Sequence, residues 1–210
     1  LKGGKGDKFL SFIGYKSGER SLMHVIIDGD PDYTKLVFAK LKKIAKRRGA
    51  FSTGKSPVEK WLHQRYSSAY LRDSLMDEAI RIDTIETAVT WHELHSLWDN
   101  TRKYIKSFPN TACMVHISHA YENGANLYFI FITPMEMDGE INSFEKFHKG
   151  LIDTIHKNGG SLSHHHGIGR LLTPWMESEV GKNGLEVLTS MKKIFDPKGI
   201  MNPGGLLGIK

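Results

Sequence analysis

Three consecutive histidines, His164 to His166, stand inside the segment Ser161–Arg170, SLSHHHGIGR, which we call the histidine loop. Imidazole titrates near neutral pH, so these side chains suit general acid–base catalysis, and glycines at 167 and 169 let a backbone approach a ligand closely. Neutral imidazole is also a metal ligand, but in an extended stretch only His164 and His166 would share a face. A metal site would need further ligands, and His116 and His119 are the nearest candidates by residue type, at a spacing that places them on opposite faces of a strand. Exposed loop histidines without chemistry are a third interpretation.

Two tyrosines and an arginine are further candidates. Tyr121 and Tyr128 stand in YENGANLYF, which we expect to form an antiparallel hairpin. Strand tyrosines usually pack half-buried, and a phenol aimed into a pocket is the functional alternative. Arg72, near the end of an expected helix, could hold a carboxylate or phosphate, because a guanidinium binds these groups bidentately. Asn202, in the turn-rich C-terminal segment, is by composition a turn former.

Strands and helices alternate around these residues. Hydrophobic patterning and turn signals predict strands over 21–30, 79–89, 112–121 and 126–133, and helices over 31–48, 57–76, 91–107, 142–157 and 184–195. Thr90 and Glu93 would form a capping box at the third helix. The order predicts an α+β fold, ferredoxin-like, with an antiparallel sheet, helices on one face and an irregular, partly helical C-terminal appendage.

The composition is that of a globular protein, with 210 residues of which 40% are hydrophobic and 25% charged. The net charge of +6 favours anionic partners, but the densest basic run, residues 40–49, fits the solvated face of an amphipathic helix. We therefore expect no nucleic-acid binding. No apolar run reaches the roughly 20 residues of a membrane span. A single cysteine, Cys113, fits an intracellular protein, cytoplasmic in a bacterium.

Several motifs together resemble the C-terminal part of FAD-linked oxidases of the vanillyl-alcohol-oxidase type. Within that superfamily the sequence is most similar to the alkyldihydroxyacetonephosphate synthases. The resemblance covers essentially the whole chain, and the motifs that carry it are YLRD (70–73), DTIETAVTW (83–91), YENGANLYF (121–129), GGSLSHHHGIG (159–169) and DPKGIMNPG (196–204). The last of these is shared by the wider flavoprotein group.

The resemblance implies FAD as the cofactor. It implies catalytic roles for Tyr128, His164, His165 and His166, substrate binding by Arg72 and Tyr121, and flavin contacts from His166, Gly167 and Asn202. Such enzymes exchange the acyl group of acyl-dihydroxyacetone phosphate for a fatty alcohol in ether lipid synthesis. An FAD-dependent oxidase or dehydrogenase of a hydroxyacid or alcohol is the alternative, and a stand-alone binding module for an anionic partner is a third hypothesis.

The resemblance also argues against a metal site. Metal-dependent relatives, the D-2-hydroxyacid dehydrogenases, carry two histidines in this hairpin and a glutamate in the histidine loop. Here Tyr121 and Tyr128 stand at the histidine positions and His165 stands at the glutamate position. We therefore expect no bound metal.

Residues 1–160 are expected to form a substrate-binding (cap) domain, and residues 161–210 the histidine loop with a flavin-contacting segment. The family holds the FAD pyrophosphate in a separate N-terminal domain, and no glycine-rich phosphate loop occurs here, so we expect that domain to be absent and the fragment alone to be inactive. Expected partners are that domain and a lipid-like or other small substrate bearing phosphate or carboxylate. Peripheral membrane contact and a homodimer are compatible with the family.

Overall fold

The computed structural model describes residues 4–17, 19–136 and 138–209. It divides into two compact units, Leu1–Ala69 and Tyr70–Lys210. This division does not coincide with the boundary at residue 160 expected from the sequence, and the assignment of residues 1–160 to substrate binding stays a prediction. None of the helices in the described ranges combines the length and apolar character needed to cross a membrane.

The first unit consists of helices and irregular segments. Its helices are α1 (Lys5–Phe12), α2 (Pro31–Arg47) and α3 (Ser56–Gln64). The start of α2 follows the sequence signals, because the carboxylate of Asp30 accepts from the backbone N–H groups of Asp32 and Tyr33.

The strand expected at 21–30 is wrong, since these residues have no regular structure. Leu22 and Met23 are exposed there. An extended segment becomes a strand only when a neighbour supplies backbone partners, and in the described part of the chain none pairs with this segment.

The second unit contains the sheet. Its elements are α4 (Leu71–Asp77), β1 (Ile80–Thr90), α5 (Leu94–Lys106), β2 (Ala112–His116), β3 (Gly124–Pro134), α6 (Glu140–Lys157) and α7 (Met176–Phe195), with 3-10 turns at Ser67–Tyr70 and Thr173–Trp175. The strands are antiparallel and lie in the order β1-β3-β2. The order β1-α5-β2-β3-α6 is that of a ferredoxin-like βαββαβ unit up to its last strand.

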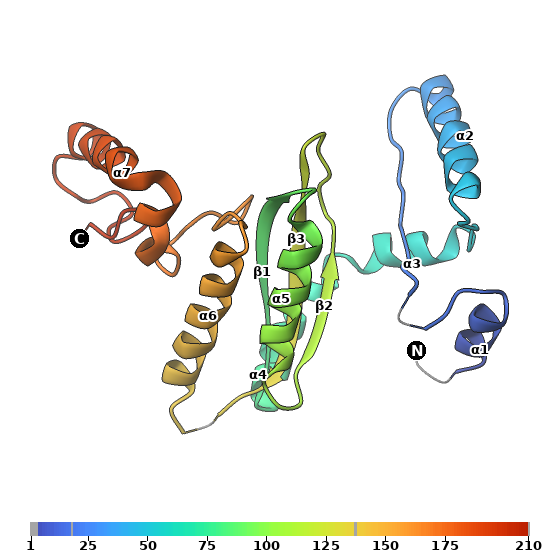
Figure 1. The fold of residues 1–210 in the computed structure, drawn as a ribbon, viewed down its shortest axis with the longest axis horizontal. Helices are drawn as coiled ribbons and strands as arrows, with labels where there is room; N and C mark the ends of the chain where they lie inside the picture. Colours follow the sequence, from blue (N-terminus) through green and yellow to red (C-terminus); the bar gives the residue numbers. More distant parts are fainter. Residues whose placement is uncertain (1–3, 18, 137, 210) are drawn as a thin grey trace. The chain divides into compact units, whose positions relative to one another are not determined.

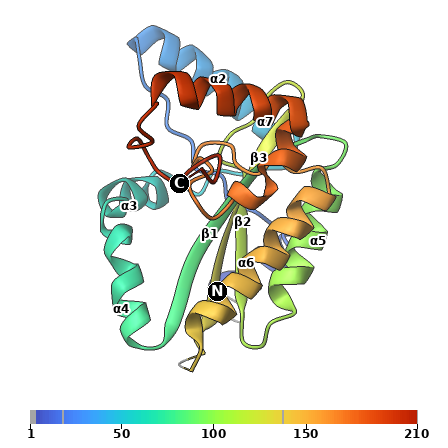
Figure 2. The ribbon, with the colours of Figure 1, turned by 90° about the vertical axis from the view of Figure 1, so that its left-hand side faces the viewer.

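Helices α5 and α6 lie side by side against one face of this sheet, as expected from the sequence (Figures 1 and 2). The rings of Phe131 on β3 and Phe147 on α6 are 4.9 Å apart. The core between the helices and the sheet also includes Ile85, Val89, Leu97, Ile105, Leu127, Phe129, Leu151, Ile152, Ile155, Leu162, Leu172 and Met176. Because strand side chains alternate, the residues between these on each strand point to the opposite face, which we call the site face.

Two element boundaries near the site face differ from the prediction. β2 ends at His116 rather than at residue 121, and the chain reaches β3 through a longer connection that includes an isolated bridge between Ala120 and Ala125. The capping box at α5 does not form, because Thr90 still pairs with Gly124 in the sheet. Its hydroxyl instead donates to the Glu93 carboxylate at 3.0 Å.

Two further helices differ from the prediction. The helix expected over 57–76 is divided into α3, a 3-10 turn and α4, and serines in the dividing stretch favour turns over helix. The last helix begins at Met176 rather than at residue 184, and it is kinked at Gly181, whose φ is 73°. The C-terminal part is thus more helical than the sequence suggested.

Candidate active site

The histidine loop begins on the free edge of β1. The backbone N–H of Ser161 donates to the carbonyl of Ala88 at 2.9 Å, and the Ser161 hydroxyl accepts from the Ala88 N–H at 2.9 Å. The buried hydroxyl of Thr87 donates to the Ser161 carbonyl at 2.7 Å. The loop therefore starts where the last strand of a ferredoxin-like unit would lie.

Glu86 organises the rest of the loop from the middle of β1. Its Oε1 accepts from the backbone N–H groups of His164, His165 and His166 at 2.7, 2.9 and 3.0 Å, and from the Ser163 hydroxyl at 2.8 Å. Its Oε2 accepts from the side-chain amide of Asn126 at 2.7 Å. The loop is wrapped around one carboxylate that is 2% exposed.

The carboxylate is charged in spite of its burial. Burial alone would raise the pKa of Glu86, but hydrogen bonds from the N–H groups of His166, His164 and His165 and from the Ser163 hydroxyl outweigh it and lower the pKa to about 2. Successive N–H groups that converge on one oxygen form an anion-binding concavity, here filled by a side chain of the same protein.

The conformation of the loop corrects one prediction. His164 and His165 do not point to opposite faces, because the backbone turns around Glu86 instead of running extended. Their Nδ1 atoms lie 3.0 Å apart. The Nδ1 of His165 also lies 3.3 Å from Oε2 of Glu86.

Tyr121 and Tyr128 both contact the histidine loop, and the resemblance implied this proximity for Tyr128. The Tyr121 hydroxyl and Nε2 of His164 are hydrogen-bonded at 2.7 Å. Tyr128 lies on the site face, opposite Glu86 on β1 and His116 on β2. Its ring lies 6.0 Å from the ring of His165, 5.1 Å from that of His166 and 4.8 Å from that of His116.

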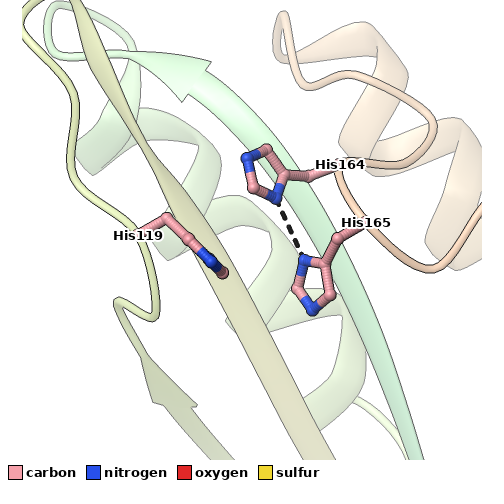
Figure 3. Close-up of side chains that lie close together, drawn as sticks. All are labelled: His119, His164 and His165. Carbon is pink, nitrogen blue, oxygen red and sulfur yellow. Dashed lines mark hydrogen bonds between the residues drawn. The ribbon is translucent and has the colours of Figure 1, made fainter.

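His119 joins the same cluster from the segment between β2 and β3 (Figure 3). Its ring lies 4.9 Å from that of His164 and 5.2 Å from that of His165. The Ser118 hydroxyl lies 2.9 Å from Nδ1 of His119 and donates to the side-chain oxygen of Asn126. Ser118 and Asn126 thereby connect His119 to Glu86.

A cleft of about 430 Å³ adjoins this cluster. Tyr121 belongs to both, since it lines the cleft and its hydroxyl is bonded to His164. This volume is in the range of small-molecule sites. The lining residues are Ala88, Val89, Thr90, Tyr121, Asn123, Gly124, Ala125, His156, Gly159, Gly160, Ser161, Ser178 and Glu179.

Arg72 lies elsewhere in the second unit. It lines a cavity of about 160 Å³ between α4, the start of β1 and the start of α6, together with Arg81 and Phe144. Among the described residues, the two cavities share no lining residue. The structure therefore does not place Arg72 with the histidine loop, and its role in substrate binding stays a prediction.

The C-terminal segment lies against the glycines of the loop. The backbone N–H of Leu206 donates to the carbonyl of Gly169 at 2.8 Å. Asn202 has a φ of 44°, and its carboxamide fills the space beside Gly205. Gly167 has a φ of 79°, which favours glycine, and apart from its chain neighbours no atom lies within 4 Å of where its Cβ would be. The backbone next to His166 is thus open to contact by a ligand.

Comparison with known proteins identifies the family of this chain. The family of C-terminal domains of FAD-linked oxidases matches residues 8–206. The chain belongs to this family. This chain is 37% identical over 170 residues to an alkyldihydroxyacetonephosphate synthase of Dictyostelium discoideum, and the match covers 78% of this chain and 28% of that protein.

A second relative and a solved structure give the same family. The synthase of Trypanosoma brucei brucei is 30% identical over 206 residues, which is 95% of this chain and 34% of that protein. A solved structure of alkyldihydroxyacetonephosphate synthase superposes with a TM-score of 0.61 at 30% identity, covering 83% of this chain and 30% of the other. This chain thus spans about a third of the length of the curated relatives that it matches.

Sequence reasoning missed Glu86, Ser163 and Asn126, and it considered His119 only as a metal ligand by residue type. The available signal for Glu86 was a carboxylate between apolar residues in a predicted strand, in IETAV. A charged side chain is rarely buried in a strand without a partner. The partner, a set of backbone N–H groups, leaves no trace in residue types.

Proposed function

We propose that this chain is the catalytic C-terminal part of an FAD-dependent transferase that exchanges the acyl group of acyl-dihydroxyacetone phosphate for a fatty alcohol. The names of the relatives support this substrate class. The observation that carries the proposal is the convergence of Tyr121, Tyr128 and the three loop histidines on one face of the sheet.

These residues form a set of proton donors and acceptors beside the cleft. The hydrogen bond between Tyr121 and Nε2 of His164 provides a route for a proton between a phenol and an imidazole. Tyr128 stacks against His165, whose ring is oriented by the Glu86 carboxylate. In this proposal, Tyr128 and the histidines transfer the proton at the reacting carbon of the substrate, and the rigid hold of Glu86 on the loop keeps them aligned.

The residues assigned to flavin contact fit a flat ring. The backbone at Gly167 is open, His166 stands next to it, and the segment with Asn202 is tied to the same loop through Gly169. Bound FAD would supply the electron-accepting ring beside which the substrate carbon reacts. This chain would contribute polar contacts to that ring and would exclude water from one side of it.

The test uses the whole protein that contains this chain. We expect it to incorporate a labelled fatty alcohol into an ether-linked product and to release the fatty acid. Tyr128→Phe and His165→Ala should each reduce this exchange by about 100-fold or more, the scale of a lost acid–base group, while the flavin absorbance is retained. His95→Ala is a matched control, because His95 is exposed on α5.

Either of two results would contradict the proposal. Near-normal exchange in Tyr128→Phe or His165→Ala would remove that residue from catalysis. No exchange, together with flavin bleaching by a 2-hydroxyacid or an alcohol, would favour the oxidase or dehydrogenase alternative. An intracellular location, peripheral membrane contact and homodimerisation stay predictions of the sequence.

A further inference from the structure

Three imidazoles from two distant segments converge on the site face. One ring nitrogen from each of His119, His164 and His165 can be chosen so that all three lie within 4.8 Å of one another. Figure 3 shows His119 approaching from the segment between β2 and β3, and the other two from the histidine loop. His119 and His165 are exposed and His164 is half-buried, so a small ion can reach them from solvent.

The spacing of the nearest ligand atoms is close to that of a tetrahedral zinc site. The Nδ1 atoms of His164 and His165 are 3.0 Å apart, and Oε2 of Glu86 lies 3.9 and 3.3 Å from them. Zinc–nitrogen bonds of about 2.0–2.1 Å place tetrahedral ligands about 3.3 Å apart. Two imidazole nitrogens and one carboxylate oxygen therefore lie 3.0 to 3.9 Å apart, near this spacing. The three imidazoles lie within 4.8 Å of one another, so the His119 ring would have to move by about 1.5 Å to complete a tetrahedral set.

Neighbouring hydrogen bonds are compatible with the lone pairs that a metal ion would need. The Ser118 hydroxyl donates to Asn126, so it accepts from Nδ1 of His119, and Nε2 of that ring remains for a ligand. Nε2 of His164 is bonded to the Tyr121 hydroxyl, and in the tautomer with the proton on Nε2 the Nδ1 lone pair of His164 faces His165. A metal would replace the proton that the two Nδ1 atoms share in their hydrogen bond. Outer hydrogen bonds of this kind orient metal-binding histidines in proteins.

The charge of the cluster also favours a cation. The Oε1 atom of Glu86 is surrounded by donors from the loop, but Oε2 accepts only from Asn126 in the described structure and faces the two imidazoles. Two Nδ1 atoms at 3.0 Å need either a shared proton or a shared cation between them.

We propose that His119, His164 and His165 bind a divalent transition metal ion, best matched by Zn²⁺, with the Glu86 carboxylate as the fourth ligand. The sequence offered His119 and the loop histidines as metal ligands by residue type, but it did not indicate Glu86. No metal was expected from the sequence, because Tyr121 and Tyr128 stand at the hairpin positions where metal-dependent relatives carry histidines. Metal binding stands independently of the proposed function. Its effect on catalysis rests on that function: a bound metal would occupy the lone pairs of His164 and His165 that the proton transfer uses, so the exchange would require the metal-free cluster.

The test is a calorimetric titration of the 210-residue chain with zinc chloride at pH 7 in a weakly coordinating buffer. We expect one equivalent of zinc to bind. His119→Gln should weaken the binding by about tenfold or more, since it removes one of three imidazole ligands. His116→Gln is the matched control, because His116 lies on the same face at the end of β2, where it stacks on Tyr128 outside the cluster. Its affinity for zinc should equal that of the unmodified chain.

A second measurement identifies the geometry. Cobalt(II) in place of zinc should give the intense visible absorption of a four-coordinate ion, and His119→Gln should lose it while its circular dichroism is unchanged. Absence of saturable zinc binding, or equal affinity in the unmodified chain and in His119→Gln, would overturn the proposal. Neither result depends on fatty-alcohol exchange, so a failure here is distinct from a failure of the proposed function.

Discussion

At the scale of single residues, Glu86 is the main determinant of the site. The histidines and tyrosines carry the candidate chemistry, but the backbone N–H groups of His164, His165 and His166 are all held by one carboxylate oxygen. A carboxylate that accepts several N–H bonds is stabilised in its charged form, and here the pKa falls to about 2. The order of the loop should therefore depend on the charge of Glu86.

Glu86→Gln tests this dependence. The pKa of Glu86, lowered from 4.5 to about 2 in the folded protein, stabilises the fold above pH 4.5, and this contribution is lost as the pH falls towards 2. It corresponds to about 3 kcal/mol at neutral pH. Urea unfolding should show a lower free energy of unfolding for Glu86→Gln at pH 7, and a difference from the unmodified chain that shrinks below pH 4.5. Glu145→Gln, exposed on α6, should show no such difference.

The prediction is wrong if the free energies of unfolding of Glu86→Gln and the unmodified chain differ by the same amount from pH 7 to pH 3. That result would mean that the shape of the Glu86 side chain, and not its charge, orders the loop.

At the scale of elements, the junction between α6 and β1 positions the histidine loop. Gly160 follows the end of α6 and precedes Ser161, which is bonded to Ala88 on the edge of β1. A Cβ at Gly160 would lie 2.5 Å from Leu97, 2.6 Å from Thr87 and 2.7 Å from Ile155. The absence of a side chain at this position lets the loop leave the helix in contact with the strand.

Gly160→Ala should therefore destabilise the protein and displace the loop. Overpacking of this kind costs about 1–3 kcal/mol, which thermal or urea unfolding can measure. The amide signals of His164 to His166 should shift in an NMR spectrum, because their bonds to Glu86 depend on the same junction. Gly6→Ala is the control, since Gly6 lies in α1 with open space around it. An unchanged stability of Gly160→Ala would show that the junction can adapt.

At the scale of the whole molecule, the two units differ in how much they bury. Every described residue that is buried lies between Ile85 and Gly205, and none lies in the described part of Leu1–Ala69. Burial of apolar surface is the main driving force of folding. The second unit therefore carries the stability of this chain, and the candidate site lies within it.

The second unit, Tyr70–Lys210, should fold when produced alone. We expect a cooperative thermal transition by circular dichroism, because its core is complete without the first unit. The first unit alone should lose its circular dichroism signal gradually on heating, without a sharp transition. A cooperative transition in Leu1–Ala69, or its absence in Tyr70–Lys210, would contradict this distribution of stability.

The sequence by itself determined the identity of most helices and strands, and its motifs identified the family. Local signals sufficed for the helices and strands, because helix caps and alternating apolar residues are local properties. Only the resemblance implied that Tyr121 and Tyr128 belong to one site with the histidine loop. Only the tertiary structure decided that residues 21–30 are not a strand, that Glu86 holds the loop and that His119 joins His164 and His165. Residues 21–30 have no pairing partner in the described structure. The position of Glu86 depends on the register of β1 with β3, which pairs Glu86 with Tyr128 and Ala88 with Asn126. Pairing between segments about 40 residues apart cannot be derived from residue types along either strand.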